Sequence, residues 1–249
     1  MNWRDFWNGE HSIYVNDRHR LLHYDRIARD ILGFVDAPDA VVLDHGCGEA
    51  SAADAVAGHV GRLCLYDVAP RVQEKLRLKF ASNSRIEVLS SQGLEAVPDA
   101  SLDLIIVNSL LQYLTRAELE HLLDFWHAKL KGNGKLVLAD IIPPDVGPLT
   151  DVKALLAFAW QGGFFFAALG GLVATFFSDY RTLRGALGLT YYTALEITAI
   201  AAAHGFALER AARNVGHNQA RMGFVGRRAE VQLFGCQFDQ RLDKMLETR

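Results

Sequence analysis

Cysteine is scarce in this chain of 249 residues: Cys47, Cys64 and Cys236 are its only three, and they are unevenly spaced. They form no C-x-x-C pair, and no His/Cys spacing typical of a metal site occurs. The sequence therefore argues against a disulfide framework or a bound metal, and it favours reduced thiols in the cytoplasm.

An excess of charge of one sign is also lacking, because 26 basic side chains face 29 acidic ones, for a formal net charge of −3. A nucleic-acid-binding surface normally shows as a basic surplus, so no nucleic-acid partner is expected. The first residues, MNWRDFWNGEHS, also lack the basic flank and apolar stretch of a secretory signal. We therefore expect a cytoplasmic protein.

Strand-like and helix-like segments alternate along most of the chain. Helices are predicted at 17–32, from about 52, at 70–80, 115–132 and 193–204; strands are predicted at 40–44, 62–67, 85–91, 102–109 and 135–144. Two helices begin with a capping box, Thr115 with Glu118 and Thr193 with Glu196, and the first of them is expected to end at Gly132. This alternation is typical of right-handed βαβ units around a parallel sheet.

The last strand-like runs, 206–214 and 220–228, are separated only by the short polar segment 215–219 and predict an antiparallel hairpin at the sheet edge. The tail at 231–249 is ambiguous between a strand and a short helix. The length fits a single α/β domain covering 1–249. Within it we expect an N-terminal cap segment, 1–35, and a hydrophobic insertion, 150–185.

The strongest local motif is the run from Asp44 to Ala50, DHGCGEA, directly after a β-branched strand. Its two glycines allow a tight turn and close approach of a ligand to the backbone, and the following helix presents free N–H groups to an anion. That anion is the methionine carboxylate of a methyltransferase cofactor or the pyrophosphate of a dehydrogenase cofactor. Asp67 ends the next strand, where an acid binds ribose hydroxyls or caps the helix that follows.

Four segments resemble class I S-adenosylmethionine-dependent methyltransferases, in the order of that family, over 41–144. VVLDHGCGEA resembles motif I, and LCLYDVAP resembles the second-strand acid; SSQGLEAVPDASLDLIIVNSLLQYL is similar to the stretch from the adenine loop through the fourth strand, and KGNGKLVLADIIPP to the segment into the fifth. The hairpin fits the sixth and seventh strands. The resemblance implies a doubly wound, mostly parallel seven-stranded sheet with helices on both faces, and methyl transfer from S-adenosylmethionine, which leaves S-adenosylhomocysteine.

The resemblance also implies a set of cofactor-binding residues: Asp44, Gly46, Cys47, Gly48, Asp67, Val68, Gln92, Gly93 and Asn108, with Tyr14 from a segment folded over the site. In this set Asp67 holds the ribose, Gln92 and Gly93 occupy the adenine loop, and Asn108 lies under the methionine end. Gln92 departs from the acid that the family often has there. A nicotinamide dehydrogenase is the rival interpretation, but its fingerprint requires glycine where Ser51 stands.

Methyl transfer from a sulfonium depends mainly on positioning, and it needs a general base only if the acceptor loses a proton. His217, at the hairpin tip, is the candidate base, although a structural role is the alternative. Tyr113 is a second catalytic candidate that is equally compatible with packing. His11 and His19 line the site or are merely exposed.

The segment 154–177 contains no charged residue over 24 positions and on length alone could cross a bilayer. Gln161 and the pairs Gly162-Gly163 and Gly170-Gly171 favour a break into two short helices. We expect a lid or acceptor pocket; a homodimer interface and peripheral membrane contact are the alternatives. The predicted acceptor is a small molecule with a partly hydrophobic body. Oxygen is the first candidate for the methylated atom, and nitrogen and carbon are the alternatives. A cofactor-binding protein without transfer activity is the alternative function.

Overall fold

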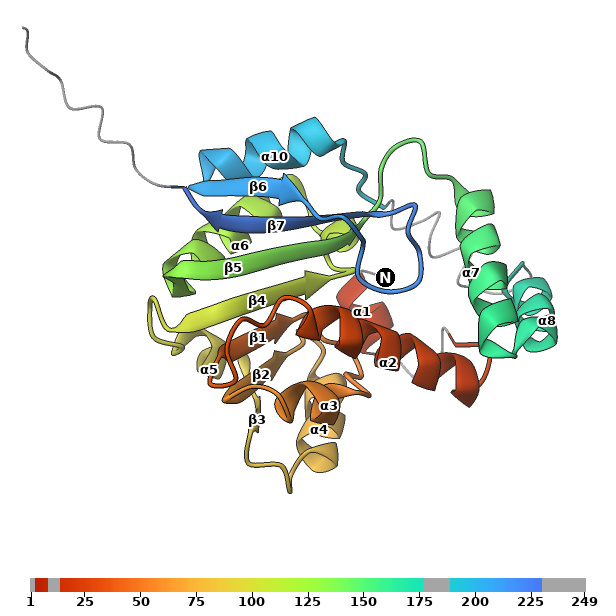
Figure 1. The fold of residues 1–249 in the computed structure, drawn as a ribbon, viewed down its shortest axis with the longest axis horizontal. Coiled ribbons are helices and arrows are strands. Elements are labelled where there is room, and N and C mark those ends of the chain that lie inside the picture. The colour runs from red at the N-terminus through yellow and green to blue at the C-terminus, as the bar shows by residue number, and fades with distance from the viewer. Residues whose placement is uncertain (1–2, 9–13, 177–188, 230–249) are drawn as a thin grey trace, which may run out of the picture.

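A computed structural model describes residues 3–8, 14–176 and 189–229, which form one sheet with helices on both faces (Figure 1). Its strand order is β3-β2-β1-β4-β5-β7-β6. The strands are β1 (Val41–His45), β2 (Arg62–Tyr66), β3 (Ile86–Val88), β4 (Leu102–Asn108), β5 (Leu130–Ile141), β6 (Phe206–Arg210) and β7 (Met222–Arg228). The first five run parallel, and β7 is antiparallel to both β5 and β6. The predicted seven-stranded sheet and terminal hairpin are confirmed; the tail at 231–249 lies outside the described residues.

The helices follow the predicted alternation. They are α1 (Trp3–Trp7), α2 (Asp17–Leu32), α3 (Ala53–Ala57), α4 (Pro70–Lys79), α5 (Ser91–Glu95), the 3₁₀ helix η1 (Leu111–Tyr113), α6 (Arg116–Lys129), α7 (Pro148–Gly162), α8 (Phe165–Phe176) and α10 (Ala194–Ala203). Both predicted capping boxes form, so Thr115 and Thr193 begin α6 and α10. One boundary prediction is wrong. Helix α6 ends at Lys129 rather than Gly132, because Leu130 already pairs with Leu102 in the sheet.

The core lies in two layers, one on each face of the sheet. On one face, Leu123 and Trp126 of α6 pack with Ile200 of α10 against the strands. On the other, Ile31 of α2 and Val56 of α3 cover β1 and β2. Strands β1 and β4 are neighbours in the sheet, but the chain continues from β1 to β2 on one side and from β4 to β5 on the other. The carboxyl ends of β1 and β4 therefore flank the point where strand order reverses.

The hydrophobic insertion folds as the pair α7 and α8, packed on α2 at one end of the molecule (Figure 1). Gly163 adopts a left-handed conformation with φ 70° and separates the helices, as the first glycine pair predicts. The predicted two helices therefore form, with their break at this first pair. Helix α8 runs through Gly170 and Gly171, since a helical glycine costs only about 1 kcal/mol and the bare Gly171 backbone lets Val15 pack against it. No described helix is long and apolar enough to cross a membrane.

Candidate active site

A cavity of about 1860 Å³ opens at the carboxyl ends of β1, β2 and β4. One end is lined by the glycine loop, and the other by α2, the insertion and the loop between β6 and β7. Of the predicted site residues, the cavity wall includes Tyr14, Asp44, Gly46, Cys47, Gly48, Asp67, Val68, Asn108, Tyr113 and His217. The sheet thus brings together residues from both ends of the sequence.

The glycine loop is fixed to the end of β2 by its own backbone. The N–H groups of Gly46 and Cys47 both donate to the Tyr66 carbonyl, at 2.8 and 3.1 Å. Gly46 has φ 84° and Gly48 has φ 56°, conformations that favour glycine. The Gly48 N–H donates to the Asp67 carboxylate at 3.1 Å. The loop is therefore held in shape by hydrogen bonds of its own backbone to Tyr66 and Asp67.

Two acids meet beside this loop. Loss of bulk water, reinforced by the nearby Asp67, raises the pKa of Asp44 to about 7. Burial also raises the pKa of Asp67, against two backbone hydrogen bonds that lower it. Asp67 accepts from the Ala69 N–H two residues on, whereas the N-cap position of α4 is Ala69 itself. Asp67 therefore organises the turn rather than capping the helix.

Asn108 ends β4 at the floor of the cavity. Its side-chain oxygen is buried and has no hydrogen-bond partner among the described residues. A buried carbonyl oxygen left unpaired costs stability, so a polar ligand atom at this place would complete the site.

Gln92 and Gly93 lie outside the cavity wall formed by the described residues. They form the first turn of α5, where the Ser90 hydroxyl accepts from the Gly93 N–H, and the Gln92 side chain is exposed. Their assignment to an adenine loop stays a prediction.

The segment before α2 folds over the glycine loop, as predicted for Tyr14. Tyr14 forms a side-chain hydrogen bond with Tyr24, and burial raises the pKa of Tyr14 to about 12. The Tyr24 hydroxyl accepts from the Glu49 backbone and lies 3.6 Å from the position that a Cβ on Gly48 would occupy. His11 lies outside the described residues. Tyr24 was not among the predicted residues, and its position directly after His23, about 100° around the helix from it, does not single it out.

Three histidines cluster at the other end. The ring centroids of His23 and His217 are 5.8 Å apart. The ring centroid of His19 lies 6.2 Å from that of His23 and 6.4 Å from that of His217. Burial lowers the pKa of all three, to about 3 for His23 and about 4 for His217. Among the described residues no group of three or more His, Cys, Asp or Glu side chains is arranged to hold a metal ion. His23 was missed, although its spacing of four from His19 on a helix signals a shared face.

Tyr113 follows β4 in η1 and is enclosed by aromatic rings. Trp3 stacks on it at a centroid distance of 5.8 Å, and Trp7 meets it edge-on at 6.0 Å. An ion pair between Arg4 and Glu118 holds α1 against α6. Tyr113 thus lines the cavity and also packs against Trp3 and Trp7, so a catalytic role and a packing role are both compatible with its position.

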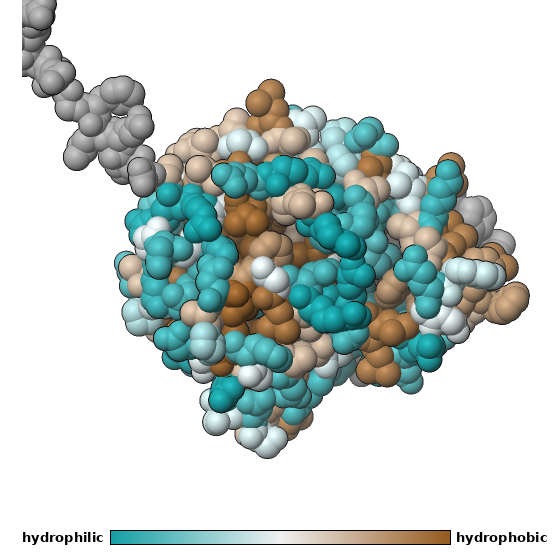
Figure 2. Space-filling model, in the orientation of Figure 1, coloured by the Kyte–Doolittle hydropathy of each residue, from teal (hydrophilic) through white to brown (hydrophobic). Residues whose placement is uncertain are grey.

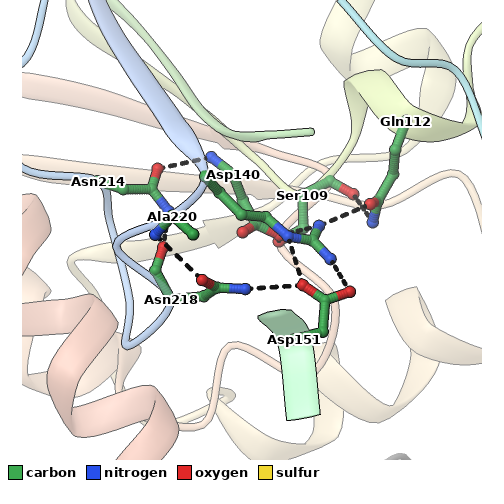
Figure 3. A network of polar contacts seen from close by, with 8 residues as sticks. Ser109, Gln112, Asp140, Asp151, Asn214, Asn218 and Ala220 are labelled. Carbon is green, nitrogen blue, oxygen red and sulfur yellow. Dashed lines mark hydrogen bonds and ion pairs between the residues drawn. The ribbon is translucent and has the colours of Figure 1, made fainter. Parts of the chain in front are cut away.

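A polar network frames the acceptor side of the cavity (Figure 3). Its centre is the buried Arg221, which donates to Gln112 at 3.0 Å and forms ion pairs with Asp140 at 3.3 Å and Asp151 at 2.9 Å. Asn218 donates to the same Asp151 of α7. The network therefore ties the insertion to β5 and to the loop before β7.

Two members of this region have strained backbones. Ser109 and Asp140 both lie in the left-handed region, at φ 59° and 58°, and the Ser109 hydroxyl donates to the Asp140 carboxylate at 2.7 Å. Asp140 sits where the pairing of β5 with β7 shifts register. Such irregularities at a strand end redirect side chains, and here they turn both into the cavity.

A known protein family and several solved structures are similar to this chain. Residues 42–134 match the family described as methyltransferase domain. No curated protein matches the chain. The chain therefore carries a methyltransferase domain, and the predicted enzyme class is confirmed.

Solved structures share the fold at low identity. The pyocyanin biosynthetic protein PhzM is 17% identical with a TM-score of 0.58, and the mitomycin 7-O-methyltransferase MmcR is 19% identical with a TM-score of 0.57. They cover 92% and 84% of this chain, which spans only 62% and 54% of theirs. The magnesium protoporphyrin IX methyltransferase ChlM from Synechocystis PCC 6803, solved with bound SAM, is 14% identical with a TM-score of 0.55. The match covers 91% of this chain and 89% of ChlM.

Proposed function

We propose that this chain binds S-adenosylmethionine at the glycine-loop end of the cavity and transfers its methyl group to a small acceptor with a hydrophobic body. The observation that carries the proposal is one continuous cavity, lined by the glycine loop at one end and by Val152, Leu155 and Leu172 of the insertion at the other.

The residues at the loop end fit this cofactor. Gly46 and Gly48 line the cavity with backbone that carries no side chain, and Asp67 follows β2 beside them, where an acid would bind ribose hydroxyls. The unpaired oxygen of Asn108 suits the amino group of the methionine portion. S-adenosylmethionine would supply a methyl group already activated on a sulfonium.

The protein's part in such a reaction is to position the acceptor and to exclude water. Val152 and Leu155 of α7 and Leu172 of α8 line the acceptor end, which favours an apolar acceptor body. We infer oxygen as the first candidate for the methylated atom, with His217 as the group that takes the proton.

Partners other than the acceptor also remain proposals. Trp160 and Phe166 are exposed on the outer side of α7 and α8, where apolar side chains gather over the end of the molecule (Figure 2). This surface supports contact with a membrane surface or with a second copy of the chain.

Calorimetric titration with S-adenosylhomocysteine tests the proposal. We expect micromolar binding by the wild type, no binding of NAD, and a loss of about 100-fold in Asp67→Ala, because two hydrogen bonds to a charged group contribute about 3 kcal/mol. Asp39→Ala, an exposed acid at the amino end of β1, is the matched control and should bind normally. Uptake of NAD with no binding of S-adenosylhomocysteine would overturn the proposal; binding without turnover on any acceptor would leave a binding protein.

A further inference from the structure

A row of ring side chains runs from the glycine loop to the insertion along one wall of the cavity. Tyr24 lies over Gly48, and Tyr14 contacts both Tyr24 and His23, at centroid distances of 5.7 and 5.4 Å. His23 then leads to His217 at 5.8 Å. The row connects the place proposed for the cofactor with the apolar end of the cavity, so a group bound at His23 and His217 lies between the two.

His23 and His217 are each held by neighbouring rings, and those of His23 are Tyr14 and Tyr24, at centroid distances of 5.4 and 5.3 Å. Phe158 of α7 stacks on His217, with ring centroids 4.7 Å apart and planes at 16°. Both imidazoles are half-buried and line the cavity. The Nδ1 atom of His23 is buried and has no hydrogen-bond partner among the described residues. The pair is thus fixed in orientation and retains hydrogen-bonding capacity.

His19 has a different part. It is 6% exposed, stacks on Phe164 with centroids 5.0 Å apart, and its Nδ1 accepts from the Val15 N–H. One face and the Nδ1 atom of its ring are therefore already engaged, and we assign His19 the role of positioning the segment around Tyr14.

The surroundings of the pair keep both rings neutral. Burial is the largest cause that lowers the pKa of each ring, and for His217 the charges of Arg221 and Arg26 add to it, against Asp151. A neutral imidazole offers one donor and one acceptor, which matches a hydroxyl group. The neutral rings themselves offer no charge to a carboxylate or an ammonium, so the pair favours an uncharged group.

We propose that His23 and His217 together bind the hydroxyl group of the acceptor, which is therefore an uncharged alcohol or phenol with an apolar body. This inference rests on the proposed function for its chemistry. The hydroxyl oxygen forms a bond to the methyl carbon, the carbon–sulfur bond breaks with its electron pair on sulfur, and the hydroxyl proton passes to an imidazole nitrogen. A weak base suffices, because the proton becomes strongly acidic as the oxygen acquires its third bond.

The probe for this site is 2-naphthol, compared with 2-methoxynaphthalene, 2-naphthoate and 2-naphthylmethylammonium. Binding is measured by naphthalene fluorescence and by nitrogen NMR of protein labelled in its histidine rings, without cofactor and again with S-adenosylhomocysteine. We expect 2-naphthol to bind about tenfold more tightly than the other three, and to shift the ring signals of His23 and His217.

Substitutions assign the effect to the pair. His23→Phe and His217→Phe should each weaken 2-naphthol binding about tenfold, since a phenyl ring keeps the shape and removes the hydrogen bonds. His23→Gln should restore part of the loss, because an amide both donates and accepts. His59→Phe, at an exposed histidine outside the cavity wall, is the matched control and should bind as the wild type does.

Equal binding of 2-naphthol and 2-methoxynaphthalene, or ring signals of His23 and His217 that do not move in the wild type, would overturn the inference. The NMR measurement does not depend on how well the variants fold. If S-adenosylhomocysteine binds while the four probes are not distinguished, the proposed function stands and this inference fails. If 2-naphthol binds as expected while S-adenosylhomocysteine does not, the proposed function fails and the hydroxyl site remains.

Discussion

The two ends of the cavity are built in different ways. At the cofactor end, every residue of one short stretch from Asp44 to Ala50 lines the cavity, and backbone N–H groups of this stretch donate to the Tyr66 carbonyl and the Asp67 carboxylate. At the acceptor end, the wall consists of side chains from α2, η1, α7, α8 and the loop between β6 and β7. The first is a local structure, and the second is an assembly of distant segments.

This difference determines what each end tolerates. Backbone hydrogen bonds survive most substitutions, so the cofactor end depends on few side chains beyond Asp67. The acceptor end depends on Arg221, whose guanidinium contacts the carboxylates of both Asp140 and Asp151, which lie 81 and 70 residues away in the sequence. We therefore expect single substitutions to disturb the acceptor end more than the cofactor end.

The largest effect is expected from Arg221→Met. Its side chain is 9% exposed, so removing the charge leaves two partly buried carboxylates without their cation, at a cost of about 3 kcal/mol in the free energy of unfolding. Urea unfolding measures this loss. Arg213→Met, at an exposed arginine of the same loop, should stay within about 0.5 kcal/mol of the wild type. A loss below about 1 kcal/mol for Arg221→Met would show that the network is not central to the acceptor end.

An intermediate effect separates the two ends by pH. The folded-state pKa of Asp44 is raised to about 7, so its contribution to stability is present at low pH and is lost as pH rises toward 7. The folded-state pKa of His23 is lowered to about 3, so its contribution is present above about pH 6.5 and is lost as pH falls toward 3. Between these pKa values, a rise in pH therefore lowers the stability contributed by Asp44 and raises the stability contributed by His23.

Urea unfolding of the ligand-free protein at about pH 4.5 and about pH 6 checks this. From the lower to the higher pH, the free energy of unfolding of the wild type should fall by up to about 2 kcal/mol relative to Asp44→Asn. Relative to His23→Gln it should rise by up to about 2 kcal/mol, since each pH unit corresponds to about 1.4 kcal/mol per group. Differences of the same sign for both variants would contradict the contrast between the two ends.

The contrast also explains what could be predicted from the sequence. The glycine loop, Asp67 and the strands around them are encoded by neighbouring residues, so their pattern predicted them, and the capping boxes fixed the starts of α6 and α10. Tyr14 was expected at the site only because the family resemblance implies an entry segment folded over it, and Tyr14 does line the cavity.

The acceptor end could be predicted only in part. His217 and the insertion could be singled out from the sequence, and both line the cavity. The Arg221 network, in contrast, joins Gln112, Asp140 and Asp151, whose proximity arises from sheet order and a register shift in β5. No local pattern encodes these contacts. The end of α6 was missed for the same reason, because the pairing of Leu130 with Leu102 overrides a glycine stop signal.

The smallest predicted effect concerns the link between the two helices of the insertion. Gly163→Ala places a side chain at φ 70°, which costs about 1 kcal/mol and lowers the melting temperature by about 3 °C. Gly170→Ala is the matched control: it lies inside α8 with open space around its Cβ position, and it should stabilise the protein by about 0.5–1 kcal/mol. Thermal unfolding followed by circular dichroism distinguishes the two signs. In Gly163→Ala we also expect 2-naphthol binding to weaken while S-adenosylhomocysteine binding stays unchanged, because the strain lies at the acceptor end; an equal loss for both ligands would mean that the two ends form one cooperative unit.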